Sequence, residues 1–257
     1  IRIEINAFDT REQLQENLEM KYTRGNEIAQ PYIFYIFNRP WGWEGSPFEK
    51  TIPVELANGH NGYVIPDSVR NIETEAFRSC EALGSIKIPN GVEKINIGTF
   101  MSCTSLSSVE IPQSVKIIDG SSFMYCESLT EVVIPNSVEA IGMGAFAFCG
   151  LKSVTLPDSV KAINEGVFDS CENLISFTIT ANLIKLDCQF CGCTSLTEIT
   201  VDKNNKYFSS DEHGVLFNKD KTQLICCPAK ANFTQYNIPD SVTSIGDYAF
   251  YNCDSLT

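Results

Sequence analysis

Basic residues are few in this 257-residue chain: 19 Lys and Arg stand against 32 Asp and Glu, giving a formal net charge of −13. Binding to nucleic-acid phosphates needs clustered Lys and Arg, and here these residues are spread thinly. The composition therefore argues against a nucleic-acid partner. Histidine is scarcer still, with only His60 and His213, far apart in the sequence. The sequence thus offers few residues for acid–base catalysis by His with a Cys or Ser nucleophile.

Long apolar runs are also missing. A membrane-spanning helix needs about 18 or more consecutive apolar residues, and the densest apolar run, Tyr32 to Phe37, is far shorter. The sequence therefore predicts no membrane span in this chain. Hydrophobic residues nevertheless make up 43% of the sequence and charged residues 20%, which is the balance of a folded protein and excludes wholesale disorder.

An internal repeat dominates the sequence. Proline recurs every 23 residues from Pro66 to Pro135, and Pro157 follows after 22. Five apolar columns keep the same phase as this proline. They are Val69, Val92, Val115, Val138 and Val160; Ile72, Ile95, Ile118, Ile141 and Ile163; Phe77, Phe100, Phe123, Phe146 and Phe168; Cys80, Cys103, Cys126, Cys149 and Cys171; and Leu83, Leu106, Leu129, Leu151 and Leu174. A sixth copy has Thr180 in place of Pro, and a seventh opens at Ile238.

This period predicts a solenoid. One coil of 23 residues cannot enclose its own apolar side chains, whereas stacked coils turn each column into a continuous buried ladder. The segment Leu83 to Ile88 alternates inward and outward as a short strand does, and its equivalents would form a parallel sheet along one side. The Pro after it fits a corner. A second extended run from Ser68 to Ile72 and a single helical or 3₁₀ turn at Ala76 to Cys80 would complete the coil.

The repeat unit I-P-x-S-V-x-x-I-x-x-x-A/S/T-F-x-x-C-x-x-L-x-x-V-x-I resembles the BspA-type leucine-rich repeat, over residues 65 to 201 and 238 to 257. The resemblance implies a right-handed leucine-rich repeat solenoid, rich in β-structure with short helical turns. Similar proteins are surface or secreted proteins of host-associated bacteria and some protists, implicated in adhesion to host proteins. The resemblance brings no catalytic residue and no cofactor, so it implies a protein that is not an enzyme.

Two segments depart from the repeat and define the domain organisation. Residues 1–62 precede the solenoid of residues 63–257 and are interpreted as an N-terminal α/β cap over the first coil, with a separate small domain as the alternative. Near residues 202–237, two β-rich runs flank the polar turn Asn218 to Lys221, which predicts a β-hairpin insertion. The hairpin acts either as a spacer or as a protruding binding element.

The eleven cysteines first suggest disulfides, a metal site or redox chemistry. Seven of them form one column: Cys80, Cys103, Cys126, Cys149, Cys171, Cys193 and Cys253. Side chains stacked in register point the same way, which suits a small buried hydrophobe and fits disulfide geometry poorly. We expect free thiols there.

The remaining four are Cys188, Cys191, Cys226 and Cys227. A thiolate zinc site in C-x-x-C-x-C is conceivable, but Cys193 belongs to the inward column, so no metal site is predicted.

The two ends of the chain suggest a piece of a longer protein. The chain starts at Ile1 without Met, and it stops at Thr257 just before the seventh coil would lay down its strand. We expect the natural protein to continue, which the mass of intact native material would test.

The outer face of the predicted sheet is the best candidate for function. Its outward rows include Lys87, Glu110, Glu131, Val133, Thr155, Thr178, Glu198 and Thr200. Such rows, rich in Ser, Thr and Glu with little aromatic anchoring, predict a shallow, extended contact surface. The sequence thus favours an extracellular or cell-surface module that binds or adheres to a protein ligand, such as a host matrix or cell-surface protein, through the sheet face or the hairpin. The alternative is an inert spacer that projects another domain.

Overall fold

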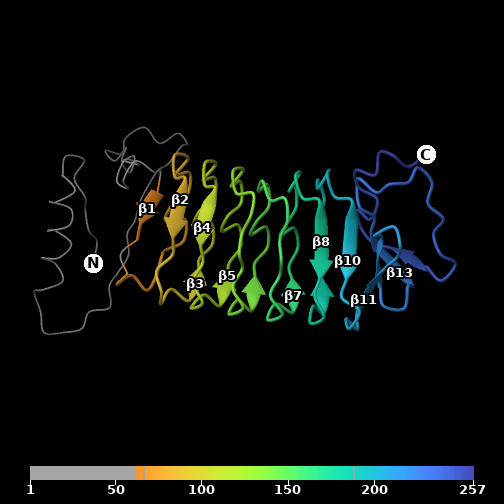
Figure 1. Cartoon of the computed structure of the whole chain (residues 1–257), viewed down its shortest axis with the longest axis horizontal. Coiled ribbons are helices and arrows are strands. Elements are labelled where there is room, and N and C mark those ends of the chain that lie inside the picture. The colour runs from red at the N-terminus through yellow and green to blue at the C-terminus, as the bar shows by residue number, and fades with distance from the viewer. Residues whose placement is uncertain (1–61, 66, 188) are drawn as a thin grey trace, which may run out of the picture.

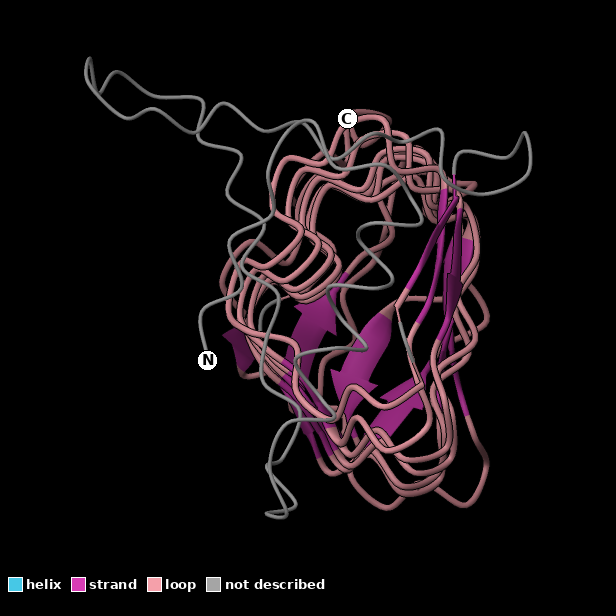
Figure 2. Cartoon of the chain, turned by 90° about the vertical axis from the view of Figure 1, so that its left-hand side faces the viewer, coloured by secondary structure: helices cyan, strands magenta, loops and turns pink. Residues whose placement is uncertain are grey.

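The computed structural model describes residues 62–65, 67–187 and 189–257. These residues form a row of stacked coils along one long axis (Figure 1), and the coils superpose when the molecule is viewed end-on (Figure 2). The predicted solenoid is therefore confirmed. The cap predicted for residues 1–62 falls almost wholly outside the described residues and stays a prediction.

One side of the solenoid carries the strand predicted after each Leu column. Strands β1 (Gly62–Val64), β2 (Ser85–Lys87) and β4 (Ser108–Glu110) form a parallel sheet. Further along, Val133 and Thr155 form an isolated parallel bridge, and β8 (Ser176–Ile179) pairs with β10 (Glu198–Val201). The paired residues are one repeat apart, as with Ser85 and Ser108. The repeat length thus sets the pairing register.

A second parallel sheet runs along another side of the coils. It consists of the two-residue strands β3 (Lys94–Ile95), β5 (Ile117–Ile118), β6 (Ala140–Ile141), β7 (Ala162–Ile163) and β9 (Lys185–Leu186), in that order. These are the short extended runs expected after each Pro corner. Their Ile and Leu side chains face the core, and the residue before each faces outward.

The segment that closes each coil is a series of turns. At Ala76 to Cys80 the sequence predicts one helical or 3₁₀ turn, and the described residues contain no helix. The N–H groups of Phe77 and Ser79 instead donate to carbonyls of the next coil, while those of Arg78 and Cys80 bond within their own coil. A helix would direct all of these donors along its own axis, so the bonds between coils replace it.

The core consists of the predicted columns. Phe100, Phe123 and Phe146 are fully buried, and their ring centroids lie 5.2–5.3 Å apart in a continuous stack. Offset stacking of this kind adds to the apolar area that each ring buries. The stack explains why one coil alone would not be stable: each ring has both faces covered only when a coil lies on either side.

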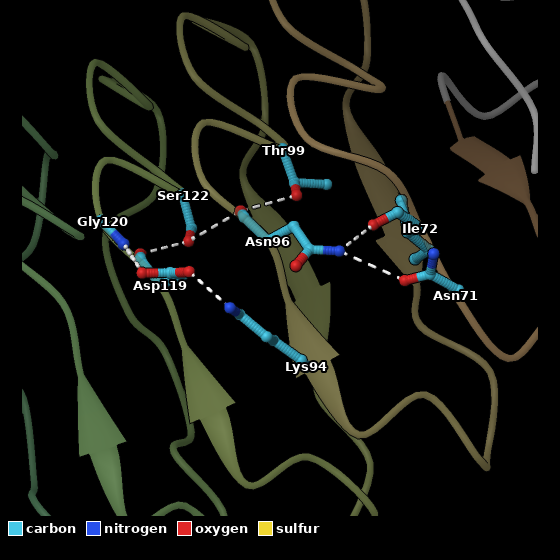
Figure 3. A network of polar contacts seen from close by, with 8 residues as sticks. All are labelled: Asn71, Ile72, Lys94, Asn96, Thr99, Asp119, Gly120 and Ser122. Atoms are coloured by element: carbon cyan, nitrogen blue, oxygen red, sulfur yellow. Dashed lines mark hydrogen bonds and ion pairs between the residues drawn. The ribbon is translucent and has the colours of Figure 1, made fainter.

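A polar network joins the coils at the corner after the second sheet (Figure 3). The Asn96 side-chain amide donates to the Ile72 carbonyl oxygen at 2.6 Å and to Asn71 Oδ1 at 3.2 Å. On the next coil, the Ser122 hydroxyl donates to the Asn96 carbonyl oxygen at 3.2 Å, and Lys94 Nζ lies 2.7 Å from Asp119 Oδ2. Two of these bonds end on the corner carbonyls of Ile72 and Asn96 and join each coil to the next.

The predicted insertion contains two consecutive hairpins, one strand more than expected. Strands β11 (Phe208–Ser210), β12 (Leu216–Asn218) and β13 (Gln223–Cys226) are antiparallel neighbours, and β13 pairs in parallel with β14 (Ser244–Ile245) of the last coil.

Strand β13 therefore extends the second side of the solenoid. The N–H of Cys227 donates to the Ala249 carbonyl oxygen, just as Phe123 donates to Ala145 in a regular coil. Cys227 thus stands in the place of a column Phe, and the insertion substitutes for part of a coil.

Candidate functional site

The eight residues predicted on the sheet face are all exposed, and they lie on strands β2, β4, β8 and β10 or at the equivalent positions of the coils between them. Lys87 lies opposite Glu110, Val133 opposite Thr155, and Thr178 opposite Thr200. Since side chains two residues apart on a strand share a face, Glu131 and Glu198 lie on this face too. We call this surface the sheet face; whether it binds a ligand stays a prediction.

Only part of the sheet face is internally paired. Lys87 Nζ lies 3.0 Å from Glu110 Oε2, and this hydrogen bond raises the pKa of Lys87. The hydroxyls of Thr178 and Thr200 are 2.9 Å apart. Val133, between these two pairs, is 82% exposed. This exposed, branched apolar side chain, whose backbone bridges to Thr155, is available for contact with a partner.

The sequence interpretation missed one exposed apolar residue just before β8. Ile175 precedes β8, is 52% exposed, and its N–H donates to the carbonyl of Lys152 in the coil before. The equivalent residues in the neighbouring coils are Lys152 and Thr197. Comparing this column across the copies would have found Ile175 as an apolar residue in an otherwise polar row.

The edge formed by the turn segments carries a second apolar surface that the sequence interpretation also missed. We call it the turn-edge patch; it comprises Ile97, Met101, Met124, Tyr125, Met143 and Phe148. Its most informative members are Tyr125 and Phe148, whose rings stack with centroids 4.5 Å apart. The sequence signal for it is the second residue after each column Phe, which is aromatic here and Ser, Gly or Asn in other coils.

The insertion carries a small aromatic cluster. The Tyr236 hydroxyl donates to Asp211 Oδ2 at 2.5 Å, and the ring of Phe233 stacks on Tyr236 with centroids 5.1 Å apart. His213 meets both rings edge-on. Burial, followed by the bond to Asp211, raises the pKa of Tyr236. Asp211 Oδ1 also accepts the N–H of Val215, so this cluster holds the β11–β12 turn against the chain after β13.

The column cysteines are thiols that serve packing. From Cys103 to Cys193, each Sγ donates to the carbonyl oxygen of the Phe one coil earlier at 3.0–3.2 Å. Burial raises the pKa of Cys80 to about 11 and that of Cys171 to about 12. A thiol must ionise before it can attack or bind a metal, so these side chains are unreactive.

One cysteine differs. The hydrogen bond between the thiols of Cys227 and Cys253 raises the pKa of Cys227 and lowers that of Cys253. Among the described residues, no group of three or more His, Cys, Asp or Glu side chains is arranged to hold a metal ion. The zinc hypothesis also involves Cys188, which lies outside the described residues. The described cysteines therefore offer one polarised thiol pair at the insertion.

The sequence model of one protein family, the BspA type leucine rich repeat region, matches this chain in six copies over residues 60–174, 116–213 and 226–257. Among curated proteins, none matches. Within the part of the chain that the structure describes, no helix has the length and apolar character needed to cross a membrane.

Solved structures share the fold. A leucine rich cell surface protein from Faecalibacterium prausnitzii is 30% identical, with a TM-score of 0.63 over 76% of this chain and 59% of its own. The pneumococcal vaccine antigen PcpA is 31% identical, with a TM-score of 0.57 over 65% of this chain and 42% of its own. A leucine-rich repeat protein from Eubacterium ventriosum, 22% identical with a TM-score of 0.61 over 67% of this chain and 46% of its own, is similar in fold alone. The chain thus spans about half the length of the structures it matches.

Proposed function

Because the chain belongs to the BspA-type leucine-rich repeat family, we propose that it is a non-catalytic, surface-exposed or secreted module that binds a protein ligand against its sheet face. The cell-surface description of the Faecalibacterium prausnitzii protein supports the location. The ligand that we propose is a host matrix or cell-surface protein, and the binding is adhesive.

The observation that carries this proposal is the exposure of Val133, 82% of whose surface is open, in the middle of the sheet face. Val133 forms a parallel bridge with Thr155, which holds its backbone in place before the ligand arrives, so little conformational entropy is lost on binding. A flat strand surface of this kind suits an extended protein ligand better than a small molecule, which requires a concave site.

The charges of the sheet face favour a contact of modest affinity. Glu131 and Glu198 lie on different coils, and Lys87 forms an ion pair with Glu110. Exposed pairs contribute little energy, and tight epitopes usually centre on Trp, Tyr or Arg. We therefore expect a shallow interface whose affinity rises when several molecules act together, as on a cell surface.

A plate-binding assay against a panel of purified host matrix proteins tests the proposal. The wild-type chain is compared with Val133→Lys and with the triple variant Glu110→Lys, Glu131→Lys, Glu198→Lys. Glu139→Lys, which reverses an exposed charge at the second sheet, is the matched control. We expect both sheet-face variants to lose at least tenfold in apparent affinity while the control binds like wild type.

The other outcomes separate the alternatives. Binding that survives both sheet-face variants but is lost on Tyr236→Phe would move the site to the insertion. If no matrix protein or intact host cell binds the wild-type chain, the module is a spacer and the binding proposal is wrong. Unchanged melting temperatures would show that the variants keep the fold.

A further inference from the structure

The turn-edge patch gathers apolar side chains where a solvated edge would be polar. Ile97 is 51% exposed, Met143 63% and Phe148 38%, while Met101, Met124 and Tyr125 are half-buried. Three of the four methionines of the chain lie in this patch. Methionine is flexible and polarisable, and surfaces that bind varied apolar side chains use it often.

The backbone shows that stability alone does not account for the aromatic pair. Tyr125 and Phe148 have φ angles of 64° and 58°, in the left-handed region that bulky residues avoid. The ladder between coils imposes this conformation, because the N–H of Tyr125 must reach the Ala147 carbonyl and that of Phe148 the Asp169 carbonyl. The same position holds Ser79, Ser102 and Ser170 in other coils. Two strained aromatic residues thus replace serine and leave their rings at the surface, a pattern typical of functional positions.

The members of the patch lie on neighbouring coils in register. The Ser102 N–H donates to the Met124 carbonyl at 2.7 Å, and the Ser121 N–H donates to the Met143 carbonyl at 2.9 Å. The small residues Gly98, Ser121 and Gly144 occupy the row between the Ile97–Met143 positions and the Met101–Met124 positions. A Cβ on Gly98 would stand 3.2 Å from Glu75 Cγ and 3.8 Å from Met101 Cβ, so the small row lets a carboxylate side chain and Met101 lie close together at this edge.

The turn segments of the patch and of the next coil carry carboxylates. Glu127 and Asp119, which pairs with Lys94, belong to the coils of the patch, and Glu165, Asp169 and Glu172 belong to the next. Over turn segments 73–82, 96–105, 119–128, 142–150 and 164–173, Arg78 is the one basic residue, and it pairs with Glu75. Burial raises the pKa of Asp169, and Glu165 nearby raises it further, while the Cys191 N–H acts in the opposite direction.

We propose that the turn-edge patch binds a basic, apolar segment of a partner protein. Apolar side chains of the segment pack on the methionines and Ile97, and a Lys or Arg lies over the Tyr125–Phe148 stack within reach of the carboxylates of the turn segments. Charge complementarity selects this occupant. A second copy of this chain, at a net charge of −13, and an anionic lipid surface would both be repelled by the same carboxylates.

Fluorescence anisotropy with a labelled 18-residue peptide of Leu and Lys, patterned as an amphipathic helix, tests the proposal. The key variant is Tyr125→Ser with Phe148→Ser, which installs the residue that other coils use at this left-handed position and therefore keeps the fold. We expect at least a tenfold weaker affinity for this variant, and a similar loss for Glu127→Lys with Glu172→Lys. The sheet-face variant Val133→Ser is the matched control and should bind like wild type, which separates this inference from the proposed function.

Further peptides and conditions decide the chemistry. A Leu–Glu peptide and a Ser–Lys peptide should each bind at least tenfold more weakly, because each lacks one half of the complementarity. Equal binding of the Leu–Lys peptide to wild type and to the double serine variant would overturn the proposal. It would also be overturned by a dimer in size-exclusion chromatography that the double serine variant abolishes, or by binding to anionic phosphatidylserine vesicles, since each assigns the patch to another occupant.

Discussion

Substitution of Gly150 by Ala tests the packing of the coils at one atom. The coil of Gly150 is one residue shorter than its neighbours, because a single residue separates Cys149 from Leu151 where Glu127 and Ser128 separate Cys126 from Leu129. The shortened chain brings the Gly150 backbone onto the preceding coil. An added Cβ would collide with the Glu127 carbonyl oxygen and stand 3.2 Å from its carbonyl carbon.

The expected loss of stability follows from what must move. The obstacle is backbone, held by the 3.4 Å bond from the Gly150 N–H to the Cys126 carbonyl, so no side chain can rotate away. Overpacking of this kind costs about 1–3 kcal/mol, and an obstacle of backbone places Gly150→Ala near the upper end. The replacement of Gly by Ala also lowers the entropy of the unfolded chain, which offsets about 0.4–1 kcal/mol of this loss of stability. We therefore expect a net loss of about 2 kcal/mol and a melting temperature lower by about 4–8 °C for a chain of this length.

Thermal and urea unfolding followed by circular dichroism measure this loss. Glu127→Ala, at the equivalent exposed position of the preceding coil, is the control and should stay within about 0.5 kcal/mol of wild type. Inserting one Ser after position 150 in the Gly150→Ala variant restores the regular spacing and should recover most of the stability. A loss below about 0.5 kcal/mol for Gly150→Ala would refute the stacking of Gly150 on Glu127.

Three further predictions concern the core, the corner and the thiols. Phe123→Ala, which removes a fully buried ring from the middle of the stack, should lower the free energy of unfolding in urea by about 3–5 kcal/mol, and a loss under about 1 kcal/mol would contradict the stack. Asp119 is partly buried, yet the bonds from Lys94 and the Gly120 N–H lower its pKa; its ion pair therefore stabilises the fold above the ordinary carboxyl pKa and is lost as the pH falls through the lowered value. Asp119→Asn should make the free energy of unfolding depend less on pH in that range, by at most about 1 kcal/mol because the pair is largely exposed. An unchanged dependence on pH would show that the pair contributes nothing. Native-state alkylation with iodoacetamide followed by peptide mass spectrometry should label Cys253, whose pKa is lowered by the Cys227 thiol, well before Cys171, whose pKa burial raises to about 12; equal rates would contradict this order.

Much of the fold could be predicted because each column makes the same demand in every coil. A Phe, Cys or Leu that recurs in phase has one way to be buried, so the solenoid and the order of its strands follow. The conformation of the turn at Ala76 to Cys80 could not be predicted, because it depends on whether the backbone N–H groups form hydrogen bonds within the turn or with the next coil. In the folded chain the Phe77 and Ser79 N–H groups bond to Thr99 and Met101 of the next coil, and the helix does not form.

The candidate surfaces were only partly predictable for a related reason. Alternation along a strand identified Val133 and Thr155 as outward-facing, and both are exposed. Strand alternation does not apply to the turn segments, so it did not identify Phe148, whose backbone is left-handed and whose ring lies on Tyr125.

The amino-acid sequence by itself determined the period, the pairing register and the inward columns of this protein. It could do so because a side chain's column and the strand's two-residue alternation depend only on position in the repeat. The tertiary structure alone decided what happens where the repeat is broken: Gly150 pressed onto Glu127, and Cys227 in the place of a column Phe. Those outcomes depend on which atoms of one coil meet the next, and that information exists only once the coils are stacked.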